Sequence, residues 1–258
     1  MAGLGPSIEL YTSQTPNGIK VVATLEELGL PYNLHKIDIL KNTQKEPWYS
    51  AINPNERIPA LTDTFTDGQA IRLFESGAIQ KYLVERYDRE YNISYPPGTR
   101  EYHEMNCWLF FLNAGVGPMQ GQATHFRLYA PEKLEYPNFR YHNECRRLYR
   151  ILNSHLQSSV SGYLVGNHCC IADIAHYGWI ACSAWSGVDI EEFPKLKQWR
   201  ERMECRPAIQ KARTVPDPWP FQDLPKDDGA SARFTKPGRD WFLKVISHDM
   251  KSYNGDRS

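Results

Sequence analysis

Segments with a strand-like hydrophobic pattern occur only before residue 75, and this asymmetry limits the folds open to the chain. Four segments are β-prone or alternate apolar and polar residues: Ile8 to Thr12, Tyr32 to Ile39, Ile58 to Thr62 and Ala70 to Phe74. From Thr99 to about Arg213, apolar residues instead recur at helical spacing. The pattern therefore predicts an α/β domain followed by an all-α domain.

Helical patterns also lie between the predicted strands. Apolar residues recur on one face from Gly18 to Leu28, and Gly29 is a stop signal. Ser76 is suited to cap a helix that carries Ile79 and Leu83. With a short helix before the third strand, the predicted order is β-α-β-α-β-β-α.

The proline-containing break at residues 95–98 marks a linker between the two domains. We expect an α/β domain over residues 1–87, a linker over 88–98, an all-helical domain over 99–213 and an extension over 214–258. Helices of the second domain are predicted over residues 102–111, 139–156, 171–185 and 192–205. The extension could cover the cleft or bind a partner, and it has four aromatic anchors: Trp219, Phe221, Trp241 and Phe242.

Composition excludes several classes of function. The 258 residues are 41% hydrophobic and 23% charged, as in ordinary folded proteins. Thirty basic residues balance thirty acidic ones, so we expect no binding of nucleic acid or of anionic membranes. The apolar stretch from Cys107 to Leu112 is much shorter than the ~20 residues of a membrane span. With no targeting signal at either end, a cytoplasmic location is expected.

The six cysteines are read as reduced thiols, most of them buried, because the chain is long and shows no secretion signal. No pair has C-x-x-C spacing, so we assign neither a metal site nor a redox dithiol. The first cysteine is Cys107, so the predicted α/β domain has no nucleophilic thiol of its own.

Five motifs, spread over both predicted domains, resemble the cytosolic glutathione transferases. They look like the bacterial nu class and the fungal class related to the yeast nitrogen-regulator prion protein. The resemblance spans about residues 8–213 and implies a thioredoxin-like N-terminal domain, an all-helical C-terminal domain and a homodimer. The motifs are Tyr11 to Lys20 (YTSQTPNGIK), Asn53 to Ala60 (NPNERIPA), Phe74 to Ile79 (FESGAI), Gly117 to Gln122 (GPMQGQ) and Phe126 to Lys133 (FRLYAPEK).

The resemblance implies a binding site for the tripeptide glutathione, used as cosubstrate. Pro59 is expected to follow a cis bond, so that the Ile58 backbone pairs with the cysteinyl unit of glutathione; the alternative is a proline at a strand edge or bulge. Ser76 and the first N–H groups of its helix suit the γ-glutamyl carboxylate, and Glu75 suits the amino group. A plain N-cap beside a solvated acid is the other reading of that pair.

At the glycyl end of the ligand, Gln44 and Arg57 stand where this class has residues that reach the carboxylate. Both could equally be solvated surface residues.

Stabilising the ligand thiolate is the expected catalytic task. The resemblance places Thr15 and Asn17 near the sulfur, with Ser13 and Tyr11 as competitors. Lowering a thiol pKa from ~8.5 to 7 needs roughly 2 kcal/mol. A helix N-terminus supplies only ~0.3–1 kcal/mol, whereas a hydrogen bond to a charged group supplies ~1.5–3 kcal/mol. Asn17 is expected to carry the larger share, unless the segment is only a turn and N-cap; Lys20 is expected to be structural.

The expected function is a glutathione-dependent enzyme that reduces a disulfide bond or conjugates glutathione to a small electrophile, as in detoxification. A fungal secondary-metabolite transferase or isomerase and a non-catalytic regulator or scaffold are the alternatives. Motif position suggests a second-substrate pocket, although its apolar members are more often core residues. The candidates are Asn106, Phe111, Gln122, His125, Phe126 and Arg140.

One departure from the family pattern concerns a helix start. Cys170 stands three residues before Asp173, where the family usually has Ser or Thr, and cysteine caps poorly. We therefore expect lowered stability there unless Asp173 finds other donors.

Overall fold

A computed structural model describes residues 7–221 and 235–245 of the chain. The first part is a four-stranded sheet in the order β2-β1-β3-β4. Strand β1 pairs parallel with β2 and antiparallel with β3, and β3 pairs antiparallel with β4. The strands are β1 (Ile8–Thr12), β2 (Tyr32–Lys36), β3 (Ala60–Thr64) and β4 (Ala70–Phe74).

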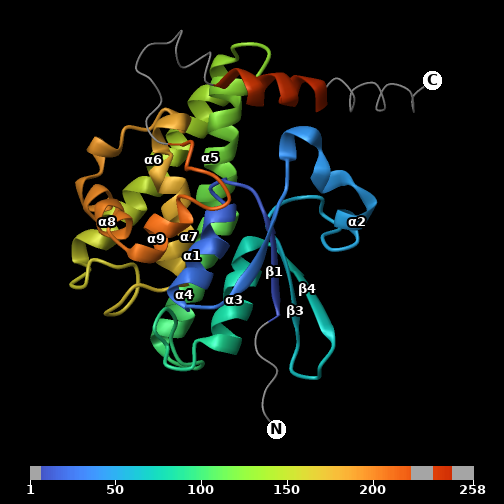
Figure 1. Cartoon of the computed structure of the whole chain (residues 1–258). Coiled ribbons are helices and arrows are strands. Elements are labelled where there is room, and N and C mark those ends of the chain that lie inside the picture. The colour runs from blue at the N-terminus through green and yellow to red at the C-terminus, as the bar shows by residue number, and fades with distance from the viewer. Residues whose placement is uncertain (1–6, 222–234, 246–258) are drawn as a thin grey trace.

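Helices α1 (Gly18–Glu27) and α3 (Ser76–Tyr87) lie between the sheet and the helical part of the molecule, and α2 (Pro47–Ser50) lies on the other side (Figure 1). Short 3₁₀ turns, Ile39–Lys41 and Thr43–Lys45, lead into α2. The predicted order of strands and helices is confirmed. The third strand begins two residues later than predicted because the Ile58–Pro59 bond is cis, which takes Ile58 out of the ladder.

The helical part begins at Arg100, and six α-helices lie between Arg100 and Ala212. Across the described residues beyond Phe74 no further strand occurs, which confirms the predicted change of pattern. The α-helices are α4 (Arg100–Phe111), α5 (Gly117–Thr124), α6 (Glu135–Ser158), α7 (Ile171–Ala181), α8 (Pro194–Glu204) and α9 (Pro207–Ala212). Two 3₁₀ turns, Ser183–Ser186 and Ile190–Glu192, connect α7 to α8.

Helix α5 was not predicted, since the glycines and proline between residues 115 and 121 hide its periodicity. Two π-helical turns, Leu112–Val116 and His125–Tyr129, connect it smoothly to α4 and extend it beyond Thr124. A further helix over residues 235–245 was also unforeseen. No helix in the described ranges combines the length and the apolar character that crossing a membrane requires.

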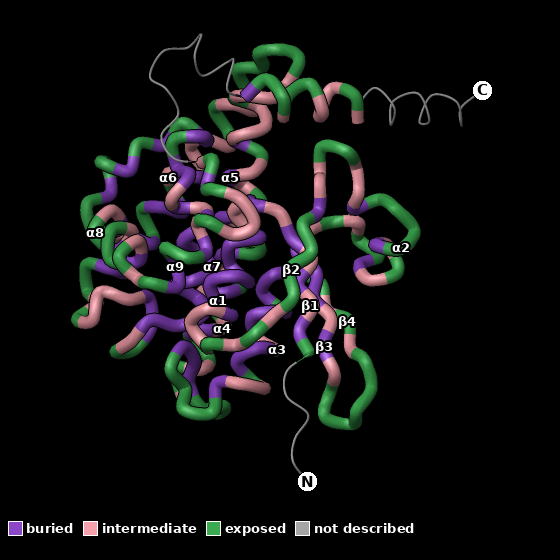
Figure 2. The backbone as a smooth tube through the Cα atoms, viewed as in Figure 1, coloured by how far each residue is buried: buried purple, intermediate pink, exposed green. Residues whose placement is uncertain are grey.

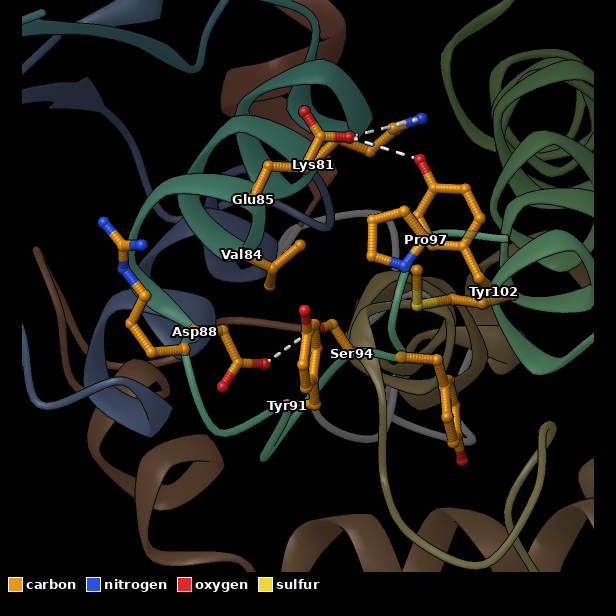
Figure 3. Close-up of a pocket in the computed structure, with 11 residues that line it drawn as sticks. Lys81, Val84, Glu85, Asp88, Tyr91, Ser94, Pro97 and Tyr102 are labelled. Atoms are coloured by element: carbon orange, nitrogen blue, oxygen red, sulfur yellow. Dashed lines mark hydrogen bonds and ion pairs between the residues drawn. The ribbon is translucent and has the colours of Figure 1, made fainter. Parts of the chain in front are cut away.

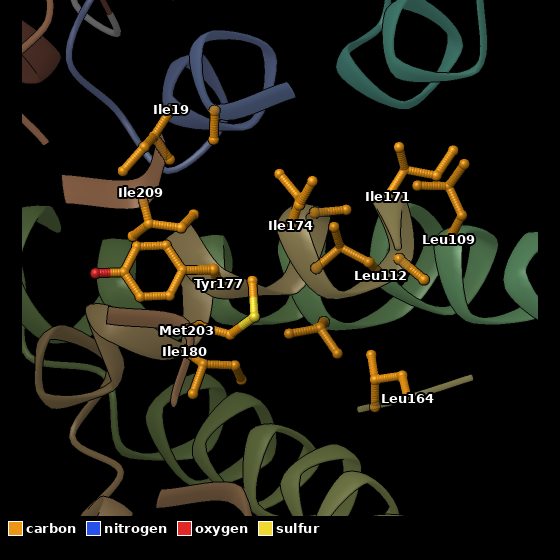
Figure 4. Packing of buried hydrophobic residues seen from close by; sticks show 14 of the residues in the cluster. Ile19, Leu109, Leu112, Leu164, Ile171, Ile174, Tyr177, Ile180, Met203 and Ile209 are labelled. Carbon is orange, nitrogen blue, oxygen red and sulfur yellow. The ribbon is translucent and has the colours of Figure 1, made fainter. Parts of the chain in front are cut away.

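Helices α1 and α7 form the middle of the core. Most of both appears as buried in Figure 2, and α1 contacts α3, α7 and α9. Figure 4 shows Ile19 of α1 and Ile209 of α9 beside Tyr177 of α7, with Ile174 further along the same helix. The sheet and the helical part therefore share one hydrophobic cluster, and α1 joins them.

At the start of α7, Asp173 finds the other donors on which the expected stability depended. Its carboxylate accepts hydrogen bonds from the Leu164 and Cys170 N–H groups, at 2.9 and 3.1 Å, and from the Trp199 indole at 2.8 Å. All six cysteines are free thiols, four of them buried, as predicted.

Candidate functional site

Three chain segments with predicted site residues meet at one edge of the sheet. In the strand register, Tyr11 lies opposite Ala60, and Ala60 lies opposite Phe74. The segments that follow β1, precede β3 and follow β4 therefore emerge side by side. They carry Ser13 to Asn17, Ile58 with cis-Pro59, and Glu75 with Ser76.

The segment after β1 is a tight loop that leads directly into α1. A Cβ on Gly18 would lie 2.1 Å from the Ser13 carbonyl oxygen, so the turn closes only with glycine. Thr15 Oγ1 accepts the Gly18 N–H at 3.0 Å and so caps the helix. Its own O–H stays available as a donor, since a hydroxyl can accept and donate at once.

Asn17 occupies the N-cap position of α1, but its side chain does a different job. The amide Oδ1 accepts a hydrogen bond from the Trp179 indole of α7 at 3.0 Å. The Asn17 side chain makes no capping hydrogen bond, and Thr15 caps the helix in its place. The amide retains two N–H donors on Nδ2.

Tyr11 and Ser13 lie on different sides of this turn. The Tyr11 ring stacks on His35, with 4.5 Å between ring centroids, and contacts Trp48 and Tyr49 on the α2 side of the sheet. Ser13 is half-buried and lines a cavity of about 420 Å³.

The segment after β4 has the backbone and side-chain features that suit an anion. Glu75 has φ 68°, a backbone conformation that costs a non-glycine residue ~1–3 kcal/mol and is enriched at functional sites. Its exposed carboxylate accepts a bond of 3.3 Å from Asn55 Nδ2. Ser76 then opens α3, whose first N–H groups attract a carboxylate.

Lys20 adds a positive charge directly behind Ser76. It is 2% exposed, and its ammonium group donates to Ser76 Oγ at 3.2 Å. Ser76 is thereby left to donate its own proton to another partner. Burial lowers the pKa of Lys20 to about 7, while the Glu75 carboxylate acts in the opposite direction. The sequence analysis expected only a structural role for Lys20 and did not predict its contact with Ser76, because tertiary packing creates that contact.

The two candidates at the glycyl end differ in burial. Gln44 is 3% exposed, so the surface-residue alternative is wrong for it, and its Oε1 has no hydrogen-bond partner within the described ranges. Arg57 is exposed, and its guanidinium donates to the Glu56 carbonyl oxygen at 3.2 Å.

The six second-substrate candidates are spread over α4, the α5 region and α6. Asn106 donates to the Tyr102 carbonyl oxygen, and Phe111 packs on His176 inside the helical part. His125 and Phe126 lie on the π-helical turn, while Gln122 and Arg140 are exposed. Aromatic residues that the sequence analysis did not select line the cavity beside Ser13: Tyr129, Trp185 and Phe221.

The helix over residues 235–245 contacts both parts of the molecule. The Trp241 indole donates to Asn42 Oδ1 at 3.1 Å, and the Phe242 ring lies 4.3 Å from that of His125. Thr235 and Gly238 line the cavity beside Ser13. All four predicted aromatic anchors contact other described residues.

A second cavity, of about 270 Å³, is unrelated to this site. It lies at the C-terminal end of α3, opposite Ser76, and is bounded by Lys81, Glu85 and Tyr102 on one side and by Asp88 and Ser94 on the other (Figure 3). These polar groups satisfy one another: Ser94 Oγ donates to Asp88 at 2.6 Å, and Tyr102 donates to Glu85 at 3.4 Å.

Comparisons with known proteins agree with this arrangement. Residues 16–86 match the model of the glutathione S-transferase N-terminal domain, and residues 120–207 match that of the C-terminal domain. The glutathione S-transferase-like protein gedE of Aspergillus terreus is 39% identical over 224 residues, which cover 83% of this chain and 97% of gedE. The disulfide-bond oxidoreductase YfcG of Escherichia coli is 40% identical over 207 residues, covering 80% and 94%.

A solved structure gives the same answer for the fold. The crystal structure of a glutathione transferase homolog from Lodderomyces elongisporus, with two GSH per subunit, superposes with a TM-score of 0.78 at 40% identity. The match covers 81% of this chain and 99% of that one. The chain therefore belongs to the glutathione S-transferase family.

Proposed function

We propose that the chain is a glutathione-dependent enzyme that stabilises the glutathione thiolate and directs it at a disulfide or an electrophilic carbon. The convergence of the α1 turn, cis-Pro59 and the Glu75–Ser76 corner at one sheet edge is the observation that carries this proposal. Ser76 and Lys20 would hold the γ-glutamyl carboxylate, Glu75 the amino group and the Ile58 backbone the cysteinyl unit. Gln44 and Arg57 would face the glycyl end.

Asn17 and Thr15 would stabilise the thiolate. Both residues keep a donor after their internal contacts are counted: Nδ2 of Asn17 and the hydroxyl of Thr15. Ionising half of a thiol with pKa ~8.5 at pH 7 needs roughly 2 kcal/mol. Two hydrogen bonds to the charged sulfur, at ~1.5–3 kcal/mol each, exceed that requirement.

Disulfide reduction would use two glutathione molecules. The first thiolate attacks one sulfur of the substrate, forming a mixed disulfide and releasing the other sulfur as a thiolate. The second thiolate attacks the mixed disulfide, giving oxidised glutathione and the second substrate thiol, so two electrons pass to the substrate. The function named for YfcG and the two GSH per subunit in the Lodderomyces structure support this scheme.

The four buried thiols of the protein are poor candidates for the attack. No cysteine precedes Cys107. Burial raises the pKa of Cys145 and Cys182 to about 12, and that of Cys169 and Cys170 well above its ordinary value.

Conjugation to an aromatic electrophile is the second candidate function. The cavity beside Ser13 is lined by Tyr129, Trp185 and Phe221, which favours a flat apolar compound. The similarity to gedE, named as transferase-like, is consistent with this alternative. Mass spectrometry of the products distinguishes the two, since reduction yields oxidised glutathione and conjugation yields a glutathione adduct.

Calorimetry with glutathione tests the common requirement. Wild-type protein should bind glutathione. Ser76→Ala should weaken binding at least tenfold, because it removes a hydroxyl donor from the proposed binding site of the γ-glutamyl carboxylate. Ser158→Ala, an exposed serine at the end of α6, is the matched control and should bind as wild type does. Wild-type protein that binds no glutathione at millimolar concentration would overturn the proposal.

A further inference from the structure

The contact between Trp179 and Asn17 joins the helical part of the molecule to the proposed thiolate site. We propose that Trp179 is the positioning residue for Asn17, an inference that rests on the proposed function. It would hold the amide so that Nδ2 faces the ligand sulfur. The observation behind it is the 3.0 Å hydrogen bond from the Trp179 indole to Asn17 Oδ1.

The chemistry of the indole settles which end of the amide it holds. An indole N–H can only donate, and the amide nitrogen can only donate as well, so a hydrogen bond between the two side chains requires the amide oxygen. The opposite orientation would set two donors against each other. With Oδ1 taken, the two N–H groups of Nδ2 are directed away from Trp179. Donation to Oδ1 also polarises the amide, which strengthens Nδ2 as a donor.

Trp179 is itself held on several sides. Its carbonyl oxygen accepts Gln120 Nε2 at 2.7 Å. A Cβ on Gly117 would lie 3.3 Å from the indole nitrogen, so α5 packs closely against the Trp179 ring. Ile174 and Tyr177, on the same helix, are buried in the cluster that includes Ile19 of α1 (Figure 4). Helix α7 is therefore a rigid base for the contact.

The backbones also approach closely at this point. A Cβ on Gly178 would lie 2.6 Å from the Pro16 carbonyl oxygen, so α7 reaches the α1 turn only because residue 178 is glycine. The turn that carries Thr15 and Asn17 is thus packed directly against α7. The geometry of the thiolate donors depends on the helical part, as well as on the sheet that carries them.

Trp179→Phe tests the inference, because it keeps an aromatic ring packed against α5 and removes the indole N–H. We expect the thiolate pKa of bound glutathione, followed by ultraviolet absorbance, to rise by roughly half to one unit. Turnover at pH 6.5 should fall roughly three- to tenfold, with little change in the KM for glutathione. When Trp179→Phe is added to the Asn17→Ala variant, it should have almost no further effect, since Trp179 acts only through Asn17.

Trp199→Phe is the matched control. This substitution also removes an indole hydrogen bond within the helical part, the one from Trp199 to Asp173 at 2.8 Å. It should lower the melting temperature and leave the pKa of the bound glutathione thiol unchanged. A folded Trp179→Phe protein that titrates as wild type does would overturn the inference. So would fully additive effects of the Trp179 and Asn17 substitutions. Either result leaves the proposed function standing if wild type binds glutathione and lowers its thiol pKa.

An indole NMR signal provides a test that does not depend on the folding of Trp179→Phe. In protein labelled with ¹⁵N, the Trp179 indole N–H should shift downfield of a solvent-exposed indole, and Asn17→Ala should move it upfield. An unchanged Trp179 signal in Asn17→Ala would show that the hydrogen bond is absent and would overturn the inference.

Discussion

At the residue scale, Lys20 shows how a binding site can oppose stability. Its ammonium group is buried beside Ser76 and near Glu75, and burial lowers its pKa to about 7. A fully hydrated lysine would keep its proton up to about pH 10.5. The folded chain thus carries a desolvated cation, whose proposed benefit is anion binding at the start of α3.

Lys20→Met should therefore raise the free energy of unfolding by about 1–4 kcal/mol near pH 6 and weaken glutathione binding. Between about pH 7 and 10.5 the unfolded wild type binds more protons than the folded one, so its stability rises with pH. The variant should lack this rise, and its advantage should shrink through that window. Denaturant melts at several pH values, with exposed Lys211→Met as control, measure the difference. A variant less stable than wild type at pH 6 would contradict the argument.

Asn17→Ala is the second prediction at this scale. If the Nδ2 donors favour thiolate over thiol, turnover should fall roughly ten- to a hundredfold while glutathione binding changes less. The thiolate titration should shift to higher pH. Asn33→Ala, which removes an exposed amide from β2, is the control. An unchanged titration would transfer the role to Thr15, Ser13 or Tyr11.

At the element scale, we expect the helix over residues 235–245 to cover the cleft, since it contacts Asn42 of the α/β part and His125 of the helical part. The segment over residues 214–221 also packs on the body: the Phe221 ring makes edge-to-face contacts with Trp219 and with Trp185, at 5.0 and 4.8 Å between ring centroids. The cavity beside Ser13 is therefore shaped by chain far from it in sequence.

Phe242→Ala should loosen this cover. We expect the KM for a bulky second substrate to rise several-fold, while calorimetric binding of glutathione stays the same, because the γ-glutamyl site lies at α3. Phe139→Ala, an exposed phenylalanine on α6, is the control. Equal kinetics for wild type and Phe242→Ala would show that the helix has no part in substrate binding.

At the scale of the whole molecule, a shared hydrophobic cluster and an ion pair hold α1 against the helical part. Arg206, between α8 and α9, donates to the Glu27 carboxylate of α1 at 2.6 and 2.8 Å. Helix α1 is thus held by the helical part along its length, and the proposed site lies at its N-terminus. A homodimer and a cytoplasmic location stay predictions.

Replacing all six cysteines tests the mechanism of the whole enzyme. Because the proposed nucleophile is the glutathione thiolate, a folded cysteine-free variant should retain most of its glutathione-dependent disulfide reduction. Each buried cysteine lost costs ~1 kcal/mol or more, so single replacements checked by circular dichroism come first. Loss of activity in one folded single variant that still binds glutathione would assign the attack to a protein thiol.

Much of the fold could be predicted from local pattern. The strands Ile8–Thr12 and Ala70–Phe74 and the start of α3 at Ser76 follow from hydrophobic period and capping chemistry. Helix α5 could not be predicted in this way, because glycines and a proline mask its period and π-helical turns continue its neighbours.

The residues of the proposed site also fall into two groups, those that local sequence motifs identify and those that only tertiary packing reveals. Pro59, Ser76, Thr15 and Asn17 belong to short motifs that the sequence displays, so their candidacy was determined by the sequence alone. Tertiary structure alone decided that Lys20 stands behind Ser76 and that Trp179 holds Asn17, over sequence separations of 56 and 162 residues. The physical reason is that a cap or turn depends on neighbours within a few residues, whereas burial and cross-domain hydrogen bonds depend on how helices pack.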